Sequence, residues 1–122
     1  MQKGTPEYDD ARNAVVEILR DQARHGAKPL RYGDLSRRLA ELGHDVPAYG
    51  GPLPYLLEDA SLEESPDGSH PMLSALVVLQ DTGWPSGGFF KLARRAPFNR
   101  SGEDETLWIT ELNSLAKHYA ET

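Results

Sequence analysis

Two short amphipathic segments, joined by a turn rich in helix breakers, constrain the fold of this chain more than any other feature. Apolar residues recur every three or four positions in both segments, which predicts helices over residues 32–42 and 52–62. The apolar positions that define the two stripes are Leu35, Leu39, Leu42, Leu53, Leu56, Leu57 and Ala60. Pro47, Gly50 and Gly51 lie between the segments and predict a turn.

Two longer helices are predicted to flank this pair. Residues 6–25 carry one apolar stripe, with Thr5 placed to cap the first turn and Pro6 suited to the first helical position. Residues 105–120 carry a second stripe that includes Trp108. We expect these N- and C-terminal helices to pack together on the core.

The stretch between the third and fourth predicted helices is expected to form a β-hairpin. Met72–Leu79 is an almost continuous apolar run, which is typical of a buried strand. Residues 81–88 are rich in glycine and predict a long loop, after which Phe89–Leu92 returns as the partner strand. The predicted class is therefore α+β and mostly α, a single winged helix-turn-helix-like domain over residues 1–122 with the hairpin as its wing.

Composition excludes several classes of protein. The chain has 122 residues and no cysteine, so disulfides and cysteine-based catalysis or zinc sites are ruled out. We expect a cytoplasmic protein without a membrane partner, because no apolar run is long enough to span a bilayer. The net charge is −6, and it is unevenly distributed. Residues 45–69 hold six acidic and no basic side chains, whereas residues 70–102 hold four basic and one acidic.

No pattern of catalytic residues stands out. The chain has no nucleophile elbow, phosphate-binding loop or dinucleotide fingerprint. The histidines lie too far apart in sequence for a short metal-ligand motif; they are His25, His44, His70 and His118. We therefore predict a protein that is not an enzyme and has neither a cofactor nor a metal, although a site assembled from distant residues stays open.

Two short motifs carry a resemblance to a known family. Tyr32-Gly33-Asp34-Leu35-Ser36 and Gly50-Gly51-Pro52-Leu53 are similar to motifs in the winged-helix DNA-binding domain of the alkylguanine-DNA alkyltransferases and their alkyltransferase-like relatives. The resemblance implies a winged-helix fold, DNA as the ligand, and Tyr32 as a matched functional position.

The chain departs from that family at two points. Where the family has its reactive Pro-Cys-His-Arg segment, this sequence reads Leu73-Ser74-Ala75-Leu76, so alkyl transfer is excluded. The arginine that enters the DNA stack in that family is expected just before the two glycines, but residues 46–49 contain none. The resemblance therefore implies a fold more than an activity.

The first functional hypothesis is binding of duplex DNA. In a winged helix, the second motif helix lies in the major groove and the wing on the backbone. Trp84 at the wing tip would pack on a sugar or a splayed base, or else fold back on the core. For Arg37 and Arg38, a solvated helix face is slightly favoured over DNA contact. The candidate DNA-contacting residues are Tyr32, Arg37, Arg38, Trp84, Lys91, Arg94, Arg95 and Arg100.

The alternative hypothesis is a protein–protein interaction module or a self-associating one. The third predicted helix is acidic where a DNA-reading helix usually carries basic or amide side chains. An acidic helix beside a basic, aromatic wing would suit a partner of mixed charge. The candidate residues for this surface are Glu58, Asp59, Glu63, Glu64, Trp84 and Phe90.

Overall fold

Helix α1 (Pro6–Arg24) is the element on which the rest of the chain is assembled. In the computed structural model, which describes residues 1–120, it contacts three other helices, α2 (Tyr32–Glu41), α3 (Leu53–Glu64) and α5 (Asp104–Tyr119), and the short 3₁₀ helix η1 (Leu73–Leu76). The Thr5 side chain accepts a hydrogen bond from the Tyr8 N–H and so caps the helix. Tyr8, Val15 and Leu19 are buried on its inner face. The predicted helix over residues 6–25 is confirmed.

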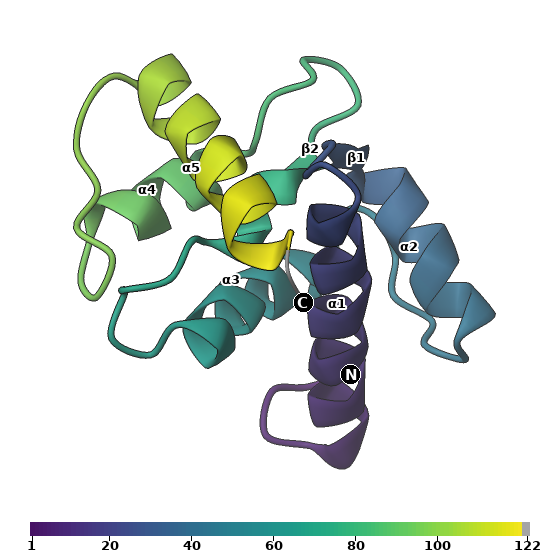
Figure 1. Cartoon of the computed structure of the whole chain (residues 1–122). Helices are drawn as coiled ribbons and strands as arrows, with labels where there is room; N and C mark the ends of the chain where they lie inside the picture. The colour runs from purple at the N-terminus through teal and green to yellow at the C-terminus, as the bar shows by residue number, and fades with distance from the viewer. Residues whose placement is uncertain (121–122) are drawn as a thin grey trace.

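The other predicted helices are also confirmed, with small shifts at their ends. Helix α2 is Tyr32–Glu41, α3 is Leu53–Glu64 and α5 is Asp104–Tyr119. The Ser36 hydroxyl donates to the Val46 carbonyl, which ties α2 to the turn before α3. Helices α1 and α5 are in contact, so the terminal helices pack together as expected (Figure 1).

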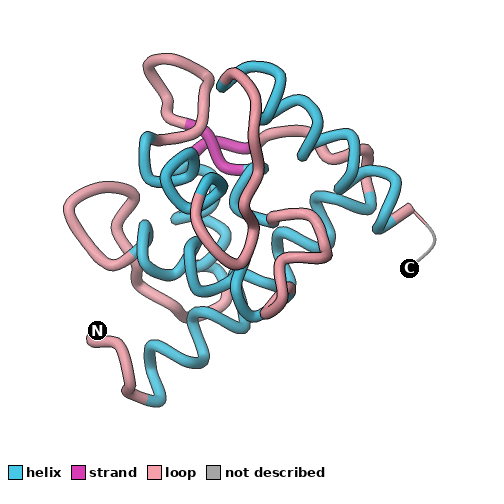
Figure 2. Tube along the Cα trace, turned by 90° about the vertical axis from the view of Figure 1, so that its left-hand side faces the viewer, coloured by secondary structure: helices cyan, strands magenta, loops and turns pink. Residues whose placement is uncertain are grey.

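The predicted β-hairpin wing is wrong. Met72–Leu79 contains the 3₁₀ helix η1 (Leu73–Leu76) and only a two-residue strand, β2 (Val77–Val78). This strand pairs in parallel with β1 (Leu30–Arg31), in the register Leu30–Val77 and Arg31–Val78. Figure 2 shows the two short strands side by side among helices. Residues 71–78 are all buried. Burial on every side leaves no periodicity, and without periodicity a strand is indistinguishable from a buried helical turn in the sequence.

The predicted return strand Phe89–Leu92 is part of a helix, α4 (Gly87–Arg94). Phe89, Leu92 and Ala93 are buried on one side of it, whereas Lys91 and Arg94 are exposed. This arrangement has helical spacing, but a four-residue apolar segment is too short to reveal it. The fold is therefore α+β and mostly α, with a minimal parallel sheet. No helix within residues 1–120 is both long and apolar enough to cross a membrane.

A buried carboxylate connects three parts of the chain. Glu111 of α5 is only 4% exposed. It accepts hydrogen bonds from the Met72 N–H at 2.9 Å and from Arg100 Nε at 2.6 Å. The Arg100 guanidinium also donates to the carbonyls of Gly68, His70 and Phe98. Arg100 was a candidate for phosphate contact, and the structure instead places its guanidinium in this internal clamp.

We predict that Glu111→Ala lowers the free energy of unfolding by about 3–5 kcal/mol, because it leaves the Arg100 cation partly buried without its partner. Glu111→Gln keeps an acceptor for Met72 and should cost less. Thr110→Ala, at the exposed neighbouring position, should change stability by less than about 0.5 kcal/mol. Urea unfolding followed by circular dichroism measures all three, and equal losses for Glu111→Ala and Thr110→Ala would contradict the clamp.

Candidate nucleic-acid interface

A pocket of about 350 Å³ opens between α2, α3, α4 and η1. Its wall is mostly apolar, and its polar side chains are few. Helix α2 contributes Tyr32, the turn before α3 contributes Gly50 and Gly51, and η1 contributes Ser74. Helix α3 contributes Tyr55 and Glu58. Ser86, just before α4, and Gly88 and Phe89 of α4 complete this part of the lining.

Tyr32 is held at the start of α2 and is buried, with 4% of its surface exposed. Its hydroxyl donates to the Ser86 Oγ at 3.3 Å, which connects α2 to the start of α4 across the pocket. Its ring stacks on Tyr49 with centroids 5.6 Å apart and an interplanar angle of 15°. Burial raises the pKa of Tyr32 above its ordinary value, which favours the protonated hydroxyl that donates this bond.

Ser74 occupies the inner wall of the same pocket and is 5% exposed. Its hydroxyl accepts a hydrogen bond from the Ser61 hydroxyl at 2.8 Å, and its N–H donates to the Ser61 Oγ at 3.0 Å. Ser61 of α3 therefore holds η1 in place and satisfies a backbone group that the sheet does not pair. Ser74 is thus a lining residue of the pocket whose hydroxyl is bonded to Ser61.

Glu58 is the only charged side chain that lines the pocket, among the described residues. Its carboxylate forms an ion pair with Arg95, at the end of α4. Both side chains are well exposed, at 36% and 52%, so the pair contributes little to stability. It nevertheless spans the gap between α3 and α4 at one side of the pocket. Arg95, a candidate phosphate contact, is thus a partner of the candidate acidic-surface residue Glu58.

The remaining predicted DNA contacts are spread over different parts of the surface. Arg37 pairs with Asp34 at 2.8 Å within α2. Arg38 bonds to Gln22 at 3.1 Å and lies 3.6 Å from Asp21, both on α1. Arg94 pairs with Asp104 at 2.7 Å. Lys91 is exposed on α4, the helix that supplies Gly88 and Phe89 to the pocket. Lys91, Arg94 and Arg95 thus lie at the C-terminal end of α4, whereas Arg37 and Arg38 lie on α2, so the candidate cations do not form one cluster.

Trp84 does not lie at a wing tip, since the described chain has no hairpin there. Its half-buried ring packs against Trp108 of α5 at 5.3 Å and against Phe90 of α4 at 6.4 Å. Trp108 in turn donates its Nε1–H to the Ala75 carbonyl at 2.9 Å. Of the two interpretations of Trp84, packing against the body of the molecule matches this geometry. Phe90 is half-buried in the same aromatic group.

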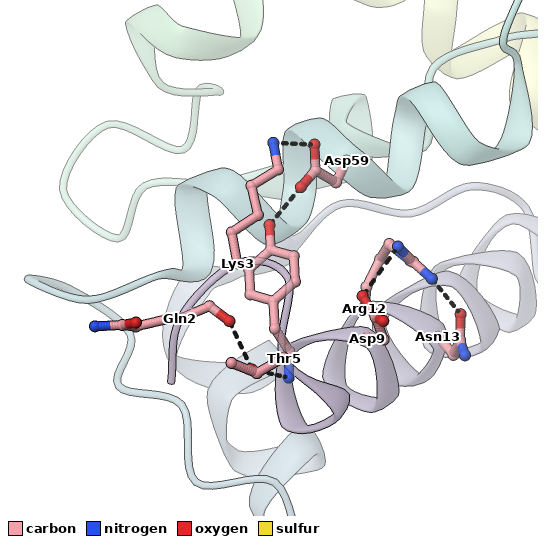
Figure 3. A network of polar contacts seen from close by, with 8 residues as sticks. Gln2, Lys3, Thr5, Asp9, Arg12, Asn13 and Asp59 are labelled. Atoms are coloured by element: carbon pink, nitrogen blue, oxygen red, sulfur yellow. Dashed lines mark hydrogen bonds and ion pairs between the residues drawn. The ribbon is translucent and has the colours of Figure 1, made fainter.

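The acidic face of α3 is largely used inside the molecule. Asp59 accepts a hydrogen bond from the Tyr8 hydroxyl and pairs with Lys3 at 3.3 Å (Figure 3). Burial, followed by the bond to Asp59, raises the pKa of Tyr8. Glu64 pairs with Arg20 of α1, and Glu63 is exposed. Most of the proposed acidic docking surface thus binds α1, the N-terminal segment and α4.

Sequence reasoning missed several pocket residues, namely Tyr55, Ser74, Ser86, Gly88 and Phe89. For Ser74, the resemblance could have indicated a site residue, because Ser74 lies in the segment that replaces the family's reactive motif. Ser86 and Gly88 are not apparent as site residues in the sequence, because the glycine-rich residues 81–88 predict a solvent loop and Phe89–Leu92 predicts a strand.

Among the described residues, no histidine lines the pocket, and its one carboxylate, Glu58, is paired with Arg95. Within residues 1–120, no group of three or more histidine or carboxylate side chains is arranged to hold a metal ion. The chain matches no protein-family model, and comparisons with curated proteins and with solved structures also found no match.

Gly51 is required by close packing at the edge of the pocket. A Cβ atom there would lie 2.7 Å from the Pro47 Cγ. We predict that Gly51→Ala lowers the free energy of unfolding by about 1–3 kcal/mol through overpacking. Gly33→Ala in α2 is the matched control, because a Cβ at Gly33 meets no atom within 4 Å. It should stabilise the helix by about 0.5–1 kcal/mol. Denaturant unfolding of both variants checks this, and effects of the same sign would be inconsistent with the turn geometry.

Proposed function

We propose that this protein is a non-catalytic DNA-binding module in which α2 and α3 form a helix-turn-helix, and in which α4 stands where the sequence predicts the returning strand of a wing. One observation carries the proposal: the separate sequence segments behind the family resemblance meet at one pocket. Tyr32 comes from the first motif, Gly50 and Gly51 from the second, and Ser74 from the segment that replaces the reactive motif. These motif residues are far apart in the sequence. That they line one pocket is expected if all of them contact the same ligand.

The chemistry of the pocket suits a nucleobase taken out of the DNA stack. A base is flat, uncharged and edged with hydrogen-bonding groups, and a pocket for it needs apolar walls with a few polar contacts. Phe89, Leu57 and Leu92 supply apolar wall, and the hydroxyls of Tyr32, Ser74 and Ser86 supply neutral donors and acceptors. The single carboxylate, Glu58, is neutralised by Arg95, which limits repulsion of the phosphates that accompany a base.

The module is proposed to bind without chemistry on the DNA. Ser74 has no neighbouring base to activate it, and its hydroxyl already accepts a bond from Ser61. Lys91 is exposed on α4, which lines the pocket, and Arg31 is exposed at the end of β1, next to the lining residue Tyr32. We propose that these two cations contact flanking phosphates. We also propose that the protein acts in the cytoplasm.

The alternative of a protein-interaction module is supported less well. Asp59 and Glu64 bind side chains of the same chain, and so does Glu58. A carboxylate that is already paired has less to offer an incoming cationic partner. Trp84 and Phe90 are half-buried against Trp108 and Phe89, so they expose less apolar surface than a free anchor would.

The proposal predicts that Gly88→Leu weakens binding to a duplex that carries one unpaired base, by at least tenfold. Gly88 lines the pocket, and a Cβ there would meet only the Ser86 Oγ, at 3.5 Å. A leucine would therefore fill the pocket from its rim without displacing the core. Gly87→Leu is the matched control, because Gly87 is the preceding residue, is exposed and is not part of the lining. Fluorescence anisotropy of labelled duplex, at low and at physiological salt, gives the affinities.

Wild-type protein should bind at low salt and weaken steeply as salt rises, because phosphate contacts release counterions. A fluorescent purine analogue at the unpaired position should also change its emission with wild-type protein and Gly87→Leu, but not with Gly88→Leu. Absence of any binding at low salt would overturn the DNA proposal. Equal affinities of Gly88→Leu and Gly87→Leu would show that the pocket is not the DNA-binding site.

A further inference from the structure

Exposed aromatic rings gather at one place on this molecule. Within residues 1–120, the largely exposed large hydrophobic side chains are Met1, Leu42, Tyr49, Tyr55 and Ile109. The two aromatic ones, Tyr49 at 54% and Tyr55 at 63%, both belong to the rim of the pocket. Tyr55 lines it directly, and Tyr49 stacks on Tyr32, which also lines it. Such rings are costly to leave in water and are favoured where they meet a flat partner.

Each of these rings also borders a second hollow. Tyr55, Gly50 and Gly51 line both the pocket and a neighbouring hollow of about 510 Å³, which extends over Pro52. Tyr49 lines a third hollow of about 320 Å³ together with Leu79 and Gln80. Tyr55 therefore borders both the pocket and the second hollow, and the Tyr32–Tyr49 pair borders both the pocket and the third hollow.

We propose that Tyr49 and Tyr55 stack the bases on either side of the one held in the pocket, so that the preferred ligand is an unpaired strand of about three nucleotides rather than intact duplex. This inference rests on the proposed DNA-binding function and names the form of nucleic acid that the site takes. In intact duplex the flanking bases remain paired and stacked on their neighbours, so their faces are not available to the tyrosines.

Two features favour a nucleic-acid strand over a peptide as the occupant. A nucleic-acid strand presents a flat ring at every unit, which matches rings that border hollows. The Tyr32–Tyr49 pair is nearly parallel, at 15°, so the outer face of Tyr49 can continue the stack with another planar ring. The segment that carries both rings is uncharged, because residues 46–57 contain no acidic or basic side chain, and stacking tolerates any base sequence. The charged side chains that line the pocket and the two hollows are Glu58, Lys3 and Asp81.

The test compares the affinity of tyrosine variants for a labelled single-stranded oligonucleotide. Tyr49→Ala and Tyr55→Ala should each weaken binding by about five- to a hundredfold, which corresponds to the loss of one stacked base. Tyr55→Phe keeps the ring and should restore most of the affinity. Leu42→Ala, just beyond the end of α2, and Ile109→Ala, on α5, are matched controls. They remove exposed apolar side chains away from the pocket and should leave affinity unchanged.

A second probe is the same oligonucleotide with abasic sugars at a run of central positions, which retains the phosphates and removes the rings. It should bind wild-type protein more weakly and erase the difference between wild type and the tyrosine variants. Excess unlabelled duplex should compete poorly for the labelled strand, and a proline-rich peptide should not compete.

The outcomes separate this inference from the proposed function. Suppose that wild-type protein binds DNA and that Gly88→Leu weakens this binding. If Tyr49→Ala and Tyr55→Ala then bind as tightly as the controls Leu42→Ala and Ile109→Ala, the stacking inference is overturned, but the pocket remains the proposed binding site. Efficient competition by the proline-rich peptide would also overturn it. If no nucleic acid binds wild-type protein at low salt, the proposed function itself fails.

Discussion

The burial of one backbone segment is the constraint on which the rest of the structure depends. Residues 71–78 are all buried, although the segment forms only one short helix and a two-residue strand. Its polar backbone groups must therefore find partners elsewhere, because an unpaired buried amide is costly. Glu111 serves the Met72 N–H, Ser61 the Ser74 N–H and Trp108 the Ala75 carbonyl, while Leu30–Arg31 pairs with the strand. Two helices, α3 and α5, and strand β1 are thus fixed around the segment.

The pocket is a consequence of this arrangement. Strand β1 runs directly into α2, so the parallel pairing that satisfies Val77–Val78 also positions Tyr32 opposite Ser86. Ser61 fixes η1 with Ser74 facing the space between the helices. A rigid framework of this kind holds polar groups in place at little cost in entropy, which is what a preorganised binding site requires. The charged residues, in contrast, mostly pair within the chain and contribute little to the character of the site.

The site therefore depends on rings and hydroxyls more than on charge. A net charge of −6 is unusual for a protein that follows phosphates, yet stacking and shape do not require a strongly basic surface. Among the described residues, the two largely exposed tyrosines, Tyr49 and Tyr55, lie at the pocket rim. Tyr49 belongs to the uncharged turn before α3. This distribution gives the proposed ligand a specific place on the molecule, which the total charge alone would not have suggested.

The helical framework can be predicted from the amino-acid sequence, because α1, α2, α3 and α5 have stripes of apolar residues long enough to show a helical period. The motif resemblance singled out Tyr32, Gly50 and Gly51, which line the pocket. The segment from Met72 to Arg94, in contrast, depends on long-range packing. Its apolar runs are buried on all sides or span four residues, so no periodicity distinguished helix from strand. Pairing with Leu30–Arg31, rather than with the segment that follows, turned the expected hairpin into a parallel strand and a helix. That long-range choice depends on contacts that local sequence does not encode.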